Sequence, residues 1–157
     1  MSVVKLEQPR PDPPALERDD IGVFANALVA ARGQFGQATK ALCAEYGLAP
    51  RGPWIIGMVG KQSLAPNELA DFFNVGRSLI TAELGRLIEA GLLVQGRDAA
   101  DGRRATLALT DAGRTVFDRL GDDLEAFMAR RLSGYSRDDI MLCARLLSDF
   151  VRGAPTA

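Results

Sequence analysis

The chain has 157 residues, a length that suits one domain or one domain with long helical extensions. It contains no histidine, which excludes Ser-His-Asp catalysis, Cys-His catalysis and every histidine-based metal site. Its formal net charge of −1 gives no overall basic footprint of the kind that nucleic-acid-binding domains usually carry. No apolar run is long enough to span a bilayer, and the first residues lack the apolar segment of a secretory signal, so we expect a cytoplasmic protein.

The N-terminal part predicts an arm followed by one long helix. Residues 1–18 hold four of the eight prolines and are interpreted as an extended or disordered arm. A helix is expected to begin at Asp19 or Asp20, which are good N-cap residues, and to end at Gly47. Apolar residues at alternating steps of three and four predict that this helix packs on other helices. They are Ile21, Phe24, Leu28, Ala31, Phe35, Ala38 and Leu42.

The central part predicts a helix-turn-helix followed by a β-hairpin. Pro53 suits the first turn of a short helix that contains Trp54. Two further short helices, one beginning near Pro66 and one near Arg77, are separated by Asn74, which tolerates a left-handed turn. The second of them is expected to turn Ile80, Leu84, Leu87 and Ile88 inward and to stop at Gly91. The segments "LLV" and "ATLAL" then read as two strands around a turn.

The C-terminal part predicts two more helices. Thr110 or Asp111 caps the first, and Ser136 with Asp139 resembles a capping box before the last. The expected fold is mainly α with a small β-hairpin wing, a winged helix-turn-helix joined to long dimerisation helices. Residues 48–109 form the DNA-binding region, and residues 19–47 with 110–153 form the dimerisation region.

The second helix of the helix-turn-helix has the residues that a major-groove contact needs. Its expected water-facing side presents Ser78, Thr81, Ala82 and Gly85, with Arg77 at its start. Small side chains allow close approach to base edges, and free N–H groups at a helix N-terminus suit a phosphate. From Arg77 to Arg104 five arginines outnumber four acidic residues, so this segment is slightly basic.

The predicted hairpin loop places paired charges at its tip. Arg103 is expected to enter the minor groove or to bind phosphate, and Asp101 is expected to hold its guanidinium in place. Arg104 is expected to contact phosphate or to pair with Asp98. The alternative is a solvated turn with incidental charge.

Residues 64–114 resemble the core of the MarR family of bacterial transcriptional regulators. The motifs that carry the resemblance are "ELA", "V-x-R-S-x-I-T", "L-x-x-x-GLL", "D-x-x-DGRR" and "LT-x-AGR". The resemblance implies a homodimer that binds a short palindrome in double-stranded DNA, commonly as a repressor. It implies release by a small molecule, often a phenolic compound or an aromatic carboxylate. It also matches Arg77, Ser78 and Thr81 to recognition-helix positions and Arg103 to the wing-tip arginine. The predicted DNA-binding residues are Arg77, Ser78, Thr81, Arg86, Arg103 and Arg104.

The sequence departs from the family pattern in the second helix. Ala82 stands where an arginine is frequent, and Glu83 stands where an apolar residue is frequent. Glu83 would repel phosphate if it faced DNA. Gly76 replaces the usual serine cap, at a cost of only a few tenths of a kcal/mol. Affinity is then expected to rest more on the wing and on dimer avidity.

An effector pocket is expected where the first helix meets the helix of Trp54, because pockets form between regions and have apolar walls. Trp54, Phe35 and Met58 would form the wall, and Arg32 or Arg51 would pair with a carboxylate. Plain core packing and solvated or intrahelical pairing are the alternatives.

Other function classes remain open. A winged-helix protein-interaction module with a decayed DNA face is one, favoured by the −1 charge, Ala82 and Glu83. A thiol-based redox-sensing regulator is another, and it needs Cys43 or Cys143 to be exposed and acidic. We expect no enzyme activity, no cofactor and no metal, since no catalytic constellation stands out.

Overall fold

The computed structural model describes residues 15–97 and 105–153. The chain divides into two compact units, Met1–Phe35 and Gly36–Ala157. Helix α1 (Arg18–Ala38) supplies the described part of the first unit, and none of its residues is buried. Its apolar residues Ile21 and Phe24 are 54% and 44% exposed, so the predicted stripe lies largely in solvent within one chain.

The prediction of a single long helix, which was based on the apolar spacing, is wrong. The chain leaves the helical conformation at Thr39, with φ −100° and ψ 0°, and α2 (Lys40–Tyr46) follows. The Thr39 side chain is buried, and its hydroxyl donates to the carbonyl oxygen of Gly36 at 3.5 Å. A threonine hydroxyl competes in this way with the backbone hydrogen bonds of a helix. Gly47 ends α2 in the left-handed region at φ 63°, as predicted.

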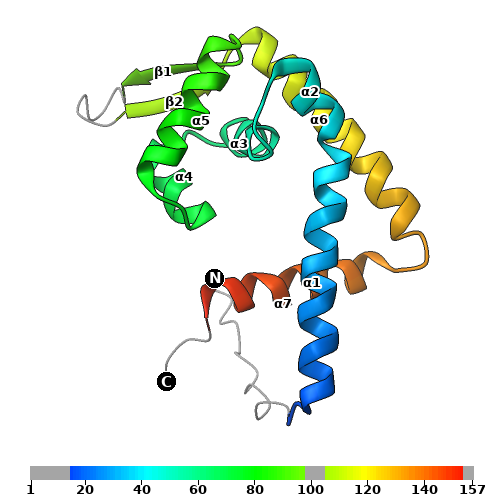
Figure 1. Ribbon diagram of the computed structural model, residues 1–157. Helices are drawn as coiled ribbons and strands as arrows, with labels where there is room; N and C mark the ends of the chain where they lie inside the picture. Colours follow the sequence, from blue (N-terminus) through cyan, green and yellow to red (C-terminus); the bar gives the residue numbers. More distant parts are fainter. Residues whose placement is uncertain (1–14, 98–104, 154–157) are drawn as a thin grey trace, which may run out of the picture. The chain divides into compact units, whose positions relative to one another are not determined.

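The second unit has the order helix, helix, helix, hairpin, helix, helix after α2 (Figure 1). This order confirms the expected winged helix-turn-helix with a small two-stranded hairpin. The elements are α3 (Gly52–Val59), α4 (Pro66–Phe73), α5 (Arg77–Glu89), β1 (Leu93–Arg97), β2 (Ala105–Leu109), α6 (Asp111–Arg131) and α7 (Arg137–Arg152).

The hairpin is antiparallel, with a register that runs from the Leu93–Leu109 pair to the Arg97–Ala105 pair. Its first strand begins one residue later and extends further than the predicted "LLV". The Leu107 amide also donates to the Leu64 carbonyl oxygen at 3.1 Å, which fastens β2 to the segment before α4. The hairpin is therefore held to the helix-turn-helix by backbone bonds.

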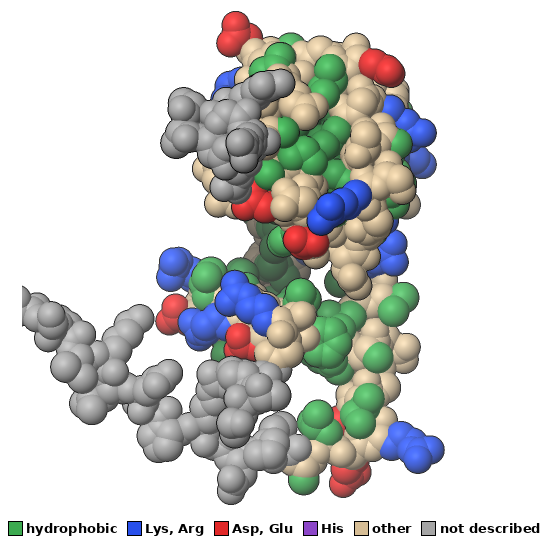
Figure 2. Space-filling view, turned by 90° about the vertical axis from the view of Figure 1, so that its left-hand side faces the viewer, with side chains coloured by type: hydrophobic (Ala, Val, Ile, Leu, Met, Phe, Trp, Pro, Cys, Tyr) green, Lys and Arg blue, Asp and Glu red, His purple; other side chains and the backbone are tan. Residues whose placement is uncertain are grey.

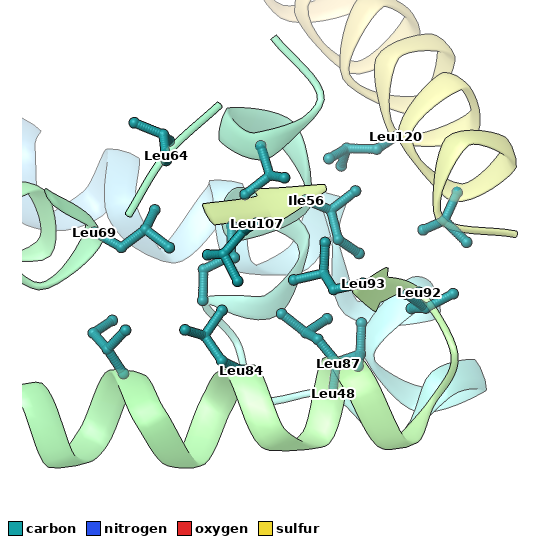
Figure 3. Close-up of a cluster of buried hydrophobic side chains, with 14 of the residues drawn as sticks. Leu48, Ile56, Leu64, Leu69, Leu84, Leu87, Leu92, Leu93, Leu107 and Leu120 are labelled. Carbon is teal, nitrogen blue, oxygen red and sulfur yellow. The ribbon is translucent and has the colours of Figure 1, made fainter. Parts of the chain in front are cut away.

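The core lies between α5, α3, the hairpin and the first half of α6 (Figure 3). Leu84 and Leu87 extend from α5 toward the side chains of the hairpin and of α3. Leu87 is 1% exposed and Ile56 is 0% exposed. Burying one leucine or isoleucine side chain stabilises a fold by about 1.5–3 kcal/mol. This apolar cluster therefore fixes which side of α5 faces inward.

The end of the hairpin is tied to the end of α5 by Thr110, the predicted cap of α6. The Thr110 hydroxyl donates to the Gly91 carbonyl oxygen at 2.7 Å and accepts from the Gly113 amide at 2.9 Å. Gly91 adopts φ 70°, a left-handed conformation that suits glycine. Gly113 is buried, and a Cβ added there would overlap the carbonyl oxygen of Leu92. The α6 helix can therefore approach this corner only through a glycine.

Substituting Gly113→Ala is expected to lower the free energy of unfolding by about 2–3 kcal/mol, because backbone atoms must move to make room. The matched control is Gly121→Ala, in the same helix, where an added Cβ meets nothing within 4 Å. The control is expected to stabilise the protein by about 0.5–1 kcal/mol, since alanine favours helix over glycine. Urea denaturation measures both. Equal effects of the two substitutions would contradict the close approach at Gly113.

Candidate nucleic-acid interface

The turn between α4 and α5 is built from local signals in the sequence. Pro66 occupies the first turn of α4, and the Ala65 amide donates to the Glu68 carboxylate at 2.7 Å. Asn74 ends α4 in the left-handed region at φ 50°, as predicted, and the Val75 amide donates to the Ala70 carbonyl oxygen at 3.0 Å. The chain therefore reverses within a few residues, and α5 begins at Arg77.

The outer face of α5 carries the predicted recognition residues. Arg77, Ser78, Thr81 and Arg86 are all exposed, as is Ala82 between them. The inner face is buried, with Ile80, Leu84 and Leu87 in the apolar cluster. Ile88 was expected inside but is 38% exposed, because it lies at the edge of the inner stripe. The solvent-facing side of the helix thus carries mostly polar and small residues, with Leu79 and Ile88 also exposed.

The first turn of α5 leaves backbone donors available. The N-cap residue Gly76 is extended and has no side-chain hydrogen bond to the helix. The Leu79 and Ile80 amides both donate to the Gly76 carbonyl oxygen, so the amides before them precede the first intrahelical bond. Such N–H groups, at the positive end of the helix dipole, suit an anion such as a phosphate. The Thr81 hydroxyl donates to the Arg77 carbonyl oxygen at 2.9 Å and keeps its acceptor lone pairs.

Glu83 does not belong to the outer face of α5. Its residue exposure is 4%, and its carboxylate accepts a hydrogen bond from Arg51 Nη1 at 2.9 Å. The expectation that Glu83 would repel DNA phosphate therefore does not apply to this arrangement. Sequence reasoning missed this ion pair. A signal was present, because position 83 falls within the inward spacing of Ile80, Leu84 and Leu87.

The predicted wing-tip residues lie outside the described residues. Asp98, Asp101, Arg103 and Arg104 therefore stay predictions, with no geometry to support or oppose them. The described part of the hairpin ends with the backbone pair Arg97–Ala105. The strands thus lead to the segment that the sequence assigns to the minor groove.

Charges on the described surface are mixed. Figure 2 looks at the side of the molecule that carries the hairpin, and Lys and Arg side chains occur there at several separate places among acidic and neutral ones. This pattern agrees with the net charge of −1. The described residues on this side of the molecule therefore form no uniformly basic face.

The predicted effector residues fall in different units. Arg32 and Phe35 belong to the first unit, while Arg51, Trp54 and Met58 belong to the second. In the second unit Met58 packs against the apolar cluster, and Trp54 is half-buried. Arg51 pairs with Glu83, a partner that the sequence did not indicate. An effector role for these residues stays a prediction.

The two cysteines differ in environment. Cys143 is exposed on α7, and Cys43 is half-buried in α2. Burial raises the pKa of the Cys43 thiol above its usual value, although a side-chain hydrogen bond with Thr39 opposes this. A raised pKa lowers the thiolate fraction, which is the opposite of what an oxidant-sensing thiol needs.

Neither a metal-binding cluster nor a membrane-spanning helix occurs in the part of the chain that the structure describes. No group of three acidic or sulfur side chains there is placed to hold a metal ion. Within residues 15–97 and 105–153, no helix is both long and apolar enough to cross a bilayer.

The segment from the end of α2 to the hairpin loop matches a known family. Residues 46–104 match the family model of the MarR family. The winged-helix region of this chain is similar to the MarR family. The match includes α4, α5 and β1, where the resemblance had been inferred from short motifs. Solved proteins that are named as members of this family are transcriptional regulators.

Individual relatives agree with the family match. The chain is similar to the HTH-type transcriptional repressor MdtR of Bacillus subtilis, with 27% identity over 113 residues that cover 71% of this chain and 73% of MdtR. Its fold is similar to that of CouR from Rhodococcus jostii bound to p-coumaroyl-CoA, with 23% identity and a TM-score of 0.74 over 92% of this chain and 99% of CouR. A MarR-family regulator from Silicibacter pomeroyi gives 22% identity and a TM-score of 0.71 over 90% and 99% of the two chains.

Proposed function

We propose that this protein is a DNA-binding transcriptional regulator that acts as a homodimeric repressor. The observation that carries the proposal is the outward face of α5, which is polar, uncapped at its N-terminus and followed directly by a hairpin. In this proposal Arg77, Ser78, Thr81 and Arg86 contact the major groove and its phosphates, because all four lie exposed on one helix. The wing residues 98–104 reach the neighbouring minor groove.

Dimerisation is supported by the amphipathic helix α7, which has no buried residue. Leu146, Phe150 and Val151 are 56%, 63% and 79% exposed, and they lie close together along one part of the helix. Apolar surface of this kind is typical of an interface between chains. We assign residues 19–47 and 110–153 to the dimer region. A two-fold dimer presents two recognition helices about 34 Å apart, which matches a palindrome in DNA.

The proposal also includes a small-molecule effector to which the regulator responds. CouR, which is similar to this chain in fold, has been solved with p-coumaroyl-CoA. We propose that this chain also responds to a small molecule, an aromatic acid or phenolic compound being the class that its sequence resemblance implies. The candidate residues are Arg32, Phe35, Arg51, Trp54 and Met58.

A protein-interaction module is the second candidate function. The mixed surface charge in Figure 2 and the alanine at position 82 favour it, because neither supplies phosphate contacts. A thiol-sensing regulator finds its support in the exposed Cys143 alone, since the environment of Cys43 raises the pKa of its thiol.

The DNA proposal is tested on duplexes selected from a random-sequence library with the wild-type protein. Arg77→Ala is expected to weaken binding to a selected duplex by about 1–3 kcal/mol, as for other arginine contacts to DNA. Fluorescence anisotropy at about 150 mM salt measures the affinity, and a salt titration measures the phosphate contribution.

The control is Arg18→Ala, which removes the same charge from an exposed position at the start of α1, outside the residues assigned to the dimer region. It is expected to leave DNA affinity nearly unchanged. Selection that yields no preferred duplex would reject the DNA proposal and favour the interaction module. Equal losses in the two variants would show that α5 is not the contacting helix.

The dimer proposal is tested by Leu146→Glu, which places a charge on the exposed apolar surface of α7. Sedimentation velocity is expected to show a dimer for the wild type and a shift toward monomer for the variant, because a buried unpaired charge is costly. Val94→Glu is the control, since Val94 is 49% exposed on the hairpin. A wild-type monomer, or a variant that remains as dimeric as the control, would contradict this interface.

A further inference from the structure

The Arg51–Glu83 pair is an ionic contact between a half-buried arginine and a buried glutamate, beside an otherwise apolar part of the fold. The Glu83 side chain is 5% exposed, and its neighbours on the inner face of α5 are Ile80, Leu84 and Leu87. Arg51, 33% exposed, lies at the N-cap of α3 and reaches Glu83 from outside the helix-turn-helix. The contact therefore joins two residues that are 32 positions apart in the sequence.

The carboxylate of Glu83 is held at one oxygen. Oε1 accepts from Arg51 Nη1 at 2.9 Å. Oε2 is buried, and no donor among the described residues reaches it. A buried charge without a partner is strongly destabilising, so Arg51 is the group that makes Glu83 tolerable at this position of α5.

Ionic and apolar contacts constrain a helix differently. Burial of the leucine side chains selects which face of the helix turns inward, but apolar attraction is non-directional and does not by itself specify an angle between two groups. A hydrogen bond between a guanidinium and a carboxylate holds only over a narrow range of distance and angle. Because Glu83 immediately follows the exposed Thr81 and Ala82, rotating α5 to break the pair would also turn the outer face.

We propose that the Arg51–Glu83 pair is a positioning device that sets the rotation of the recognition helix and thereby the preference for specific over nonspecific DNA. Neither residue contacts DNA in this role. The inference rests on the proposed DNA-binding function, which it deepens, but its effect on α5 exists in the free protein and is measurable there.

If the Arg51–Glu83 pair only stabilised the fold, two well-packed apolar residues could replace it without any change in DNA preference. Substituting a buried ion pair by well-packed apolar residues is often neutral or stabilising, whereas removing one partner is strongly destabilising. The double variant Arg51→Leu with Glu83→Leu therefore separates stability from positioning. It removes the directional bond and leaves no unpaired charge.

The experiment compares the wild type with this double variant in three measurements. Urea denaturation is expected to give similar stability. Amide hydrogen exchange of α5 in the free protein is expected to be faster in the variant. The ratio of affinities for a selected duplex and for a scrambled duplex is expected to fall about tenfold, within the range of couplings carried by residues that do not touch the ligand.

The matched control is Arg119→Met, which removes an ion pair between α6 and α2 in which Arg119 Nη1 lies 2.7 Å from Glu45 Oε2. This exposed pair does not involve α5, so exchange in α5 is expected to match the wild type. If the double variant is as stable as the wild type and shows the same α5 exchange and the same affinity ratio, the proposal is overturned.

Failure of the proposed function is distinguishable from failure of this inference. If the wild type selects no DNA sequence, the DNA proposal fails, and α5 exchange alone decides the positioning role. If the double variant does not fold, the positioning role is tested by comparing amide exchange of α5 in the Glu83→Gln and Glu83→Met variants. Gln keeps an oxygen acceptor for Arg51, so its α5 exchange is expected to lie closer to the wild type than that of Met. The opposite order would reject the inference.

Discussion

The burial of the inner face of α5 is the constraint on which the rest of the candidate interface depends. Leu84 and Leu87 are fixed against the hairpin and α3 (Figure 3), and the opposite face must then be exposed. One rotation of α5 buries Ile80, Leu84 and Leu87 together, so hydrophobic packing also selects the residues that DNA can meet. The outward position of Arg77 and Thr81 is a consequence of this packing.

The hairpin and the recognition helix are joined at one compact corner. Thr110 bonds both the end of α5, through Gly91, and the start of α6, through Gly113. The Thr110 amide also donates to the Leu92 carbonyl oxygen at 3.1 Å. Because the strands leave from this corner, the direction of the wing is coupled to the direction of α5. A winged helix needs both elements to meet one stretch of DNA.

Local signals in the sequence predicted the helix-turn-helix, the Asn74 turn, the Gly47 stop and the caps of α6 and α7. Apolar periodicity also predicted the outer face of α5. Apolar periodicity gave wrong predictions at two positions, where a side chain behaves differently from most residues of its type. Thr39 interrupts a continuous apolar stripe because its hydroxyl bonds to the backbone. Glu83 is a charge on the inner stripe, and only the position of Arg51, set by tertiary packing, explains it. No spacing rule links residues 51 and 83.

The central claim is that the outer face of α5 touches DNA. We would place a cysteine at Thr81 in a chain that carries Cys43→Ser and Cys143→Ser, and measure its rate of thiol labelling with and without a saturating selected duplex. Thr81 is exposed in the free protein, and Ser133 provides an exposed control position outside α5. The account predicts strong protection at position 81 and none at position 133. Bound DNA that leaves the labelling rate at position 81 unchanged would contradict it.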